Sequence, residues 1–154
     1  MRARVQGTLA KGMHGITAGG PEIMGCWTKF LTVFEESAMR IHNLYEDEFG
    51  QSHFRDIEVE WVSEGRGGKL SERLPATGII FRQVQPDYQL NWHPAPRRQY
   101  IINLDAGVEI TASDGEARII AAGEVILVED TSGDGHMSKA VDEQIRHCIF
   151  VPVE

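Results

Sequence analysis

From residue 55 onward, apolar and polar residues alternate in short segments. In RDIEVEWV, residues 55–62, Ile57, Val59 and Trp61 alternate with two glutamates. This is the period-two pattern of a half-buried strand, and it predicts Trp61 in the core. Further segments of this kind cover residues 77–84, 88–93, 99–104, 107–113, 117–123, 124–130, 137–141 and 145–153, separated by turns rich in Gly, Pro and Asp. Such short strands at roughly ten-residue spacing predict an all-β antiparallel sandwich or barrel.

The first forty residues differ from the rest. The stretch MRARVQGTLAKGMHGITAGGPE has no acidic residue before Glu22 and no sustained apolar period. Three interpretations stay open: a disordered tail, a weak organelle-targeting segment, or a stretch upstream of a true start at Met39. Residues 26–42 are compatible with a short helix. We therefore divide the chain into an N-terminal extension, residues 1–40, poorly structured or short helical, and a β-barrel, residues 41–154.

Charge and cysteine content narrow the function classes. The net charge is −8, and residues 41–154 carry ten Lys/Arg against twenty Asp/Glu, which disfavours binding to nucleic acid. Cys26 and Cys148 lie far apart without paired spacing, which favours reduced thiols in the cytoplasm. No apolar run approaches the roughly 18 residues of a membrane span. A soluble cytoplasmic protein is expected.

Two motifs in the barrel resemble those of the cupin superfamily. His93 and Gly107 match the first histidine and the closing glycine of the first motif, but Ala95 stands in place of its second histidine and Tyr100 in place of its glutamate. In the second motif, Gly123 and His136 match, Glu129 replaces a proline, and the turn DTSGDG is about two residues longer than usual.

The resemblance implies a cupin-type jelly-roll barrel and suggests a homodimer, with the strand at residues 55–62 and the N-terminal segment as candidate interfaces. Cupins include oxygenases, isomerases, epimerases, storage proteins and sensors. Membership therefore does not choose a function.

His93 and His136 are the candidate metal ligands, because neutral imidazole suits Fe, Mn, Ni and Zn. Two histidines alone make a poor site, since a catalytic metal normally has three protein ligands and an open position. Glu129 or Asp130 is the candidate third ligand, and Gln99 offers a neutral oxygen. The alternatives are polar-pocket histidines without a metal and a solvated turn at the two acids.

Other residues near His93 suggest an organic ligand. Tyr100, if it faces the barrel interior, is a candidate general acid or hydrogen-bond donor. Arg97 and Arg98 are adjacent, so only one of them faces inward, where it would hold a carboxylate or phosphate. Trp92 is expected to alternate away from His93. His147 is expected to share a face with Ile145 and Ile149, as a hydrogen-bonded histidine of the core or the barrel rim.

Three functions stay open. The favoured one is a module that binds a small organic molecule, anionic or neutral, through Tyr100, His93, His136 and one arginine, with Gln99 and Trp92 as further contacts. The second is a metal-dependent oxygenase or isomerase that uses His93 and His136. The third is a metal-free epimerase-like enzyme with a histidine base and Tyr100 as the acid.

Overall fold

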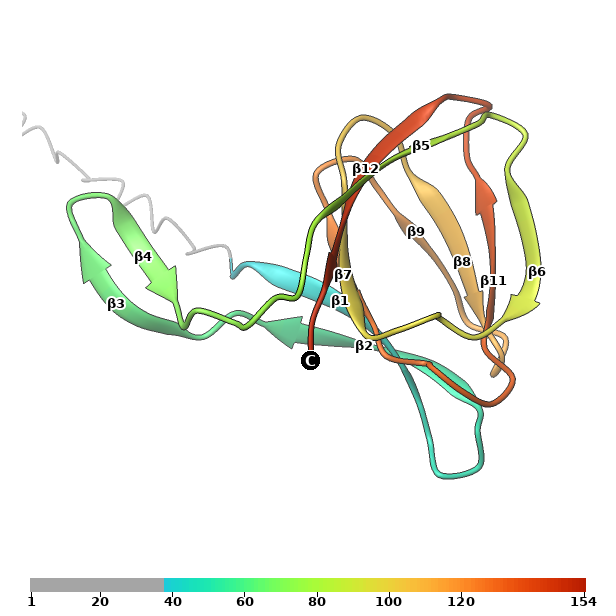
Figure 1. Ribbon diagram of the computed structural model, residues 1–154, viewed down its shortest axis with the longest axis horizontal. Helices are drawn as coiled ribbons and strands as arrows, with labels where there is room; N and C mark the ends of the chain where they lie inside the picture. The colour runs from blue at the N-terminus through green and yellow to red at the C-terminus, as the bar shows by residue number, and fades with distance from the viewer. Residues whose placement is uncertain (1–37) are drawn as a thin grey trace, which may run out of the picture. The chain divides into compact units, whose positions relative to one another are not determined.

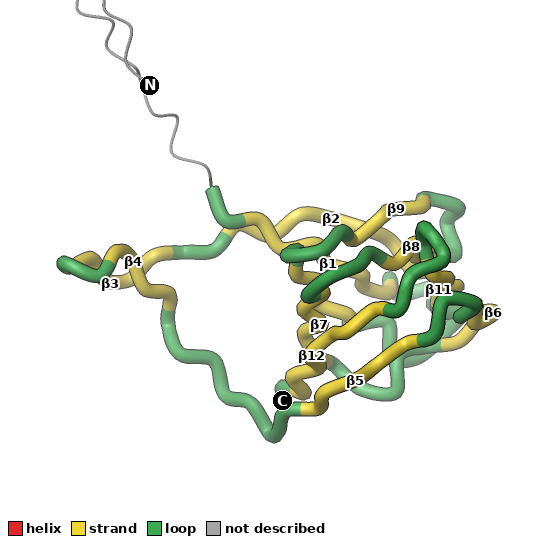
Figure 2. Tube along the Cα trace, turned by 90° about the horizontal axis from the view of Figure 1, so that it is seen from above, coloured by secondary structure: helices red, strands yellow, loops and turns green. Residues whose placement is uncertain are grey.

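The computed structural model describes residues 38–154, which contain strands and loops but no helix (Figures 1 and 2). Among these residues there is accordingly no helix long and apolar enough to cross a membrane. The strands are β1 (Arg40–Glu46), β2 (Ser52–Glu58), β3 (Trp61–Gly65), β4 (Gly68–Ser71), β5 (Ile80–Val84), β6 (Gln89–His93), β7 (Gln99–Asn103), β8 (Val108–Ala112), β9 (Ala117–Ile120), β10 (Val125–Val128), β11 (His136–Ala140) and β12 (Arg146–Pro152).

Strands β5 to β12 form the two facing sheets of a jelly roll. One sheet has the order β10-β7-β12-β5 and the other the order β6-β11-β8-β9. Neighbours in both sheets are antiparallel, and the chain crosses between the sheets repeatedly, as two interlocked Greek keys require. The predicted all-β jelly-roll barrel is confirmed.

Strands β1 and β2 extend the first sheet. β1 pairs in parallel with β10, through partners such as Asn43 and Leu127, and β2 pairs antiparallel with β1. The sheet therefore has six strands, with β2 and β5 at its two edges.

Alternating apolar residues build the core between the sheets. In β8, Val108, Ile110 and Ala112 are buried, while the residues between them are partly exposed. They pack in one cluster with residues from the opposite sheet, including Ile126 and Val128 of β10. The buried face of β8 therefore follows the period-two spacing of its apolar residues.

The segment predicted as one strand over residues 55–62 is divided in the structure. β2 ends at Glu58, and β3 begins at Trp61 and pairs only with β4 among the described strands. Every residue of β3 is exposed, and Trp61 is 41% exposed, so its predicted core position is wrong. The alternation is real, but the described part of the chain places no opposing layer on this two-stranded hairpin against which one face would be buried.

The predicted helix over residues 26–42 is wrong where it can be compared, because Arg40 to His42 belong to β1. The rest of that segment, and most of the predicted extension at residues 1–40, lie outside the described residues.

Candidate functional site

A cavity of about 340 Å³ lies inside the barrel. This size is near the lower end of small-molecule sites, which are roughly 300–1,000 Å³. Several core residues, among them Val108, Ile110 and Ile126, also line the cavity, so its walls are largely apolar. The polar side chains that line it are Arg82, Tyr88, His93, Gln99, His136, Ser138 and Arg146.

One end of the cavity carries the two predicted histidines. His93 ends β6, His136 begins β11, and the two are direct partners in the antiparallel ladder. Their ring centroids are 4.4 Å apart, with the planes inclined at 53°. The predicted proximity of His93 and His136 is therefore present, from a sequence separation of 43 residues.

Hydrogen bonds fix the tautomers of both rings. Nδ1 of His93 lies 2.7 Å from the carbonyl oxygen of Asn91, and Nδ1 of His136 lies 2.6 Å from Oδ2 of Asp130. Both oxygens only accept, so each Nδ1 donates its proton, and each neutral ring keeps an Nε2 lone pair. Neither Nε2 has a hydrogen-bond partner in the described part of the chain. Two imidazole acceptors are thus available at this end.

The long turn before β11 sets the position of His136. Gly135 has φ of +68°, and a Cβ added there would lie 2.2 Å from the carbonyl carbon and oxygen of His93. Gly133, with φ of +67°, approaches Gly50 in the same way. Only glycine accommodates both the backbone conformation and the close approach, so the turn brings His136 beside His93.

The two candidate third metal ligands lie elsewhere. Asp130 is fully buried behind His136, where its Oδ2 accepts the imidazole proton and its Oδ1 has no hydrogen-bond partner. Glu129 accepts hydrogen bonds from Asn43 and Arg98 and does not line the cavity. Among residues 38–154, no group of three His, Cys, Asp or Glu side chains is arranged to hold a metal ion. The described residues therefore do not supply the donor set of a two-histidine, one-carboxylate metal site.

Alternation along β7 separates Gln99 from Tyr100. Gln99 is buried and lines the cavity, and Ile101 follows it on the same face. Tyr100 is only partly buried and does not line the cavity, so the structure does not place it as the internal acid that the sequence suggested. Ala95, which replaces a cupin histidine, is buried and lines the cavity.

The predicted arginines also lie outside the cavity lining. Arg97 is exposed, and Arg98 donates hydrogen bonds to Glu129 and to the backbone carbonyl of Glu154. Trp92 is half exposed and does not line the cavity, as its alternation from His93 predicts. His147 is bonded to Asp105, as expected of a hydrogen-bonded histidine, but it is exposed, so the core position is wrong.

Sequence reasoning missed a second polar end of the cavity, made by Arg82, Tyr88, Ser138 and Arg146. The Tyr88 hydroxyl lies 2.8 Å from Oγ of Ser138. Arg146 is 4% exposed and donates from Nη1 to Oδ1 of Asn103 at 2.7 Å. Burial lowers the pKa of its guanidinium. The sequence carried only an ambiguous signal, because Arg146 shares one period-two face of β12 with Cys148 and Phe150 while the opposite face is also apolar.

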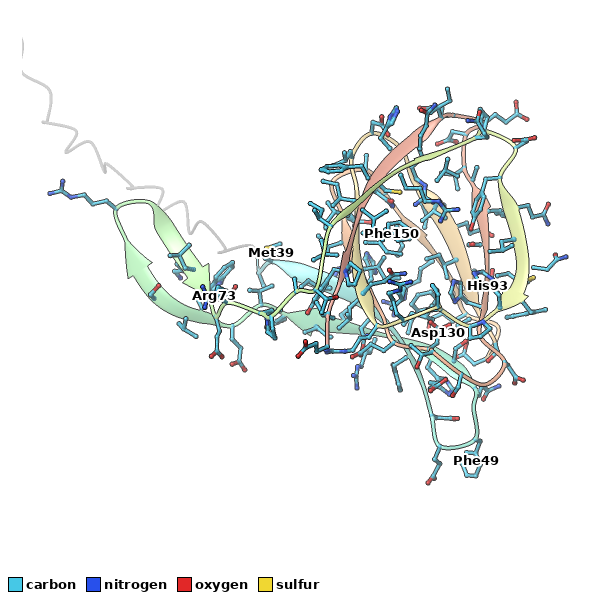
Figure 3. All side chains as sticks on the ribbon, in the orientation of Figure 1. Met39, Phe49, Arg73, His93, Asp130 and Phe150 are labelled. Carbon is cyan, nitrogen blue, oxygen red and sulfur yellow. The ribbon has the colours of Figure 1, made fainter. Side chains whose placement is uncertain are left out.

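The two polar ends correspond to the two ends of β7. Gln99 begins the strand and pairs with Val128, two residues before Asp130. Asn103 ends the strand and holds Arg146. Figure 3 draws His93 and Asp130 near one another at one end of the barrel, with Phe150 farther along it. We refer to these regions as the histidine end and the arginine end.

Fold and cavity together define the class: an all-β jelly-roll domain with an internal cavity. No protein-family model matches the chain, and no curated protein matches it.

Among solved structures, the chain is similar to protein NMB1881 from Neisseria meningitidis, with 17% identity, a TM-score of 0.39, and coverage of 54% of this chain and 81% of that one. A conserved protein of unknown function from Streptococcus pyogenes has 25% identity and a TM-score of 0.40, over 55% of this chain and 70% of that one. A putative ethanolamine utilization protein Q from Salmonella typhimurium has 12% identity and a TM-score of 0.34, over 75% of this chain and 97% of that one. Likenesses at these TM-scores carry no argument about function, which rests on the cavity itself.

Proposed function

We propose that this protein is a cupin-type jelly-roll domain that binds a small organic molecule inside its barrel. The observation that carries the proposal is the cavity of about 340 Å³, whose apolar walls enclose a few convergent polar side chains. Apolar walls stabilise the body of a ligand, and precisely placed polar groups fix its orientation. A protein that only needed a stable core would gain by filling this space, because unfilled core volume is destabilising.

Binding is tested by closing the cavity. In Ile110→Phe the larger side chain enters the cavity, whereas in Ile119→Phe it stands on an exposed position of β9 and serves as the control. Untagged protein is analysed by native mass spectrometry for a retained small molecule, and a fragment library is screened by ¹H–¹⁵N NMR.

We expect a retained molecule, or fragments that shift resonances of the cavity residues, in wild type and Ile119→Phe but not in Ile110→Phe. If no molecule is retained and no fragment shifts those resonances, the binding function is wrong.

A proton-transfer enzyme is the second candidate, and the Asp130–His136 hydrogen bond favours it. The buried carboxylate accepts the Nδ1 proton and orients the ring, so that Nε2 is positioned to accept a proton from a ligand. Tyr88, which lines the same cavity, takes the role of hydroxyl donor that the sequence assigned to Tyr100.

Asp130→Asn separates the two candidates once a ligand is known. The substitution leaves the shape of the side chain but removes the charge that supports a histidine base. Loss of ligand proton exchange with unchanged ligand affinity supports the enzyme, whereas wild-type protein that exchanges no ligand proton with solvent contradicts it.

The metal-dependent alternative has its own test: Fe, Mn, Ni or Zn would bind to His93 and His136, and Gln99, which lines the same cavity, offers a neutral oxygen. Metal analysis of untagged wild type, His93→Ala and His136→Ala decides it. Near-stoichiometric metal in wild type that both variants lose would establish the metal site and contradict the metal-free functions.

A further inference from the structure

The buried guanidinium of Arg146 has an incomplete set of partners. Asn103, its hydrogen-bond acceptor, is neutral, and the buried Nε of Arg146 has no hydrogen-bond partner among the described residues. Within residues 38–154 no carboxylate forms an ion pair with Arg146. A buried charge is costly unless it is paired and hydrogen-bonded, so this position favours an anion from outside the chain.

The surroundings of Arg146 add donors but no negative charge. Arg82 lines the same cavity, with its guanidinium 5.3 Å from the ring centre of Tyr88 and 5.5 Å from that of Phe150. Tyr88 and Ser138 contribute hydroxyl groups. Asp and Glu are both absent from the cavity lining in the described part of the chain.

The carboxylate whose charge acts on Arg146, that of Asp105, already accepts hydrogen bonds from another residue. Asp105 acts on Arg146 only through the longer-range field, and both of its carboxylate oxygens accept hydrogen bonds from His147. Although the whole chain has a net charge of −8, this end of the cavity holds two arginines for which residues 38–154 supply no counter-ion.

We propose that the arginine end is an oxyanion subsite, in which Arg146 and Arg82 bind a carboxylate or phosphate group of the organic ligand. Guanidinium groups recognise both oxyanions through paired N–H donors, and the apolar cavity walls hold the rest of the molecule. This subsite rests on the proposed function and specifies the class of ligand: an organic acid or phosphate ester with an apolar body.

The wild-type protein allows a direct test by NMR of the Arg146 Nε–Hε resonance. Sodium acetate, phosphate and benzoate are titrated at constant ionic strength against sodium chloride, with benzamide as a neutral analogue of benzoate. We expect saturable shifts with at least one of the three oxyanions and none with chloride. Unchanged Arg146 resonances in acetate, phosphate and benzoate would overturn the subsite.

Variants assign the binding to the two arginines. Arg146→Gln is expected to abolish the response of the cavity resonances to benzoate, and Arg82→Gln to weaken benzoate binding by about tenfold, the effect of losing one charge-assisted hydrogen bond. Arg82→Gln also provides the test if Arg146→Gln does not fold, because Arg82 is exposed. Arg97→Gln, at an exposed site outside the cavity lining, is the matched control and is expected to bind like wild type.

The failures of the two proposals are distinguishable. One outcome is that benzamide shifts the cavity resonances as strongly as benzoate and that Arg82→Gln and Arg146→Gln bind benzoate with wild-type affinity. This outcome would support the binding function and overturn the oxyanion subsite. Absence of cavity shifts with the charged and neutral probes and with the fragment library would overturn both.

Discussion

Replacing Gly135 with alanine tests whether the turn before β11 holds the two histidines together. The substitution has two costs that the structure separates. The first is backbone conformation, because φ at residue 135 is +68° and the left-handed region costs a non-glycine residue about 1–2 kcal/mol.

The second cost of Gly135→Ala is overlap. The new Cβ would lie 2.2 Å from the carbonyl carbon and oxygen of His93, where ordinary contacts are 3.4–4 Å. These are backbone atoms, so they have no rotamer that relieves the clash, and such overpacking costs about 1–3 kcal/mol. Together the two terms predict a loss of about 2–5 kcal/mol, a large part of the roughly 5–15 kcal/mol that stabilises a domain.

Gly123→Ala is the matched control. Gly123 has φ of +81°, but a Cβ there meets no atom within 4 Å, so only the backbone cost of about 1–2 kcal/mol applies. Urea unfolding followed by tryptophan fluorescence measures both losses. A loss for Gly135→Ala no greater than that for Gly123→Ala would refute the argument that close packing against His93 requires glycine.

Three further predictions follow from other contacts. His53 lies between Asp47 and Asp114, and its hydrogen bonds to the two carboxylates raise its pKa above the ordinary 6.5, with Asp47 making the larger contribution. The same bond lowers the pKa of Asp47. A histidine with a raised pKa in the folded state stabilises the fold fully below pH 6.5, and this stabilisation is lost as the pH rises through the folded-state pKa. His53→Gln should therefore lower the free energy of unfolding in urea more at about pH 5.5 than at about pH 9. Equal losses at the two pH values would contradict this prediction. Asn103→Leu removes the hydrogen-bond acceptor of Arg146 and should lower the free energy of unfolding by about 3 kcal/mol in the same assay. Benzoate should restore part of this loss if it binds at the oxyanion subsite. A loss below about 1 kcal/mol would mean that the buried hydrogen bond contributes little to stability. The edge strand β5 exposes Ile80 and Phe81, the latter to 75%, and we expect β5 to pair with β5 of a second copy in a twofold dimer. Phe81→Glu should then shift the mass measured by light scattering from that of a dimer to that of a monomer. A wild-type protein that is monomeric at all concentrations would exclude this interface.

Local alternation predicted the all-β class, and the resemblance of the two motifs predicted the jelly roll. The segments from residue 77 onward that alternate or run apolar are close to strands β5 to β12, and the glycine-containing turns separate them correctly. β1 was missed because RIHNLYE has no clean alternation, and its buried residues include His42 and Asn43, which composition assigns to the surface. Its burial depends on the neighbouring strands β2 and β10, which the local sequence does not report.

The two histidines of the candidate site were predicted from the sequence, but several of the other residues that face the cavity were not. His93 and His136 were paired through the spacing of two motifs, and the structure places them side by side. The inward-facing residue was misassigned in two neighbouring pairs, Gln99 with Tyr100 and Arg146 with His147. A shift of the strand alternation by one residue exchanges the inward and outward members of such a pair. Both faces of β12 carry apolar residues, Cys148 and Phe150 on one and Ile149 and Val151 on the other, so hydropathy could not choose between them.

The two polar ends of the cavity lie at the two ends of β7, so the length of this strand sets the distance between them. Gln99 and Asn103 are four residues apart on one strand, which corresponds to about 13 Å. A ligand that contacts both the histidine end and the arginine end must match this span, so chain length becomes a criterion of selectivity beside charge. Because strand rise sets the span, an insertion or a shifted strand register in β7 would change the distance between the two ends, whereas substitutions at either end would change how tightly that end binds.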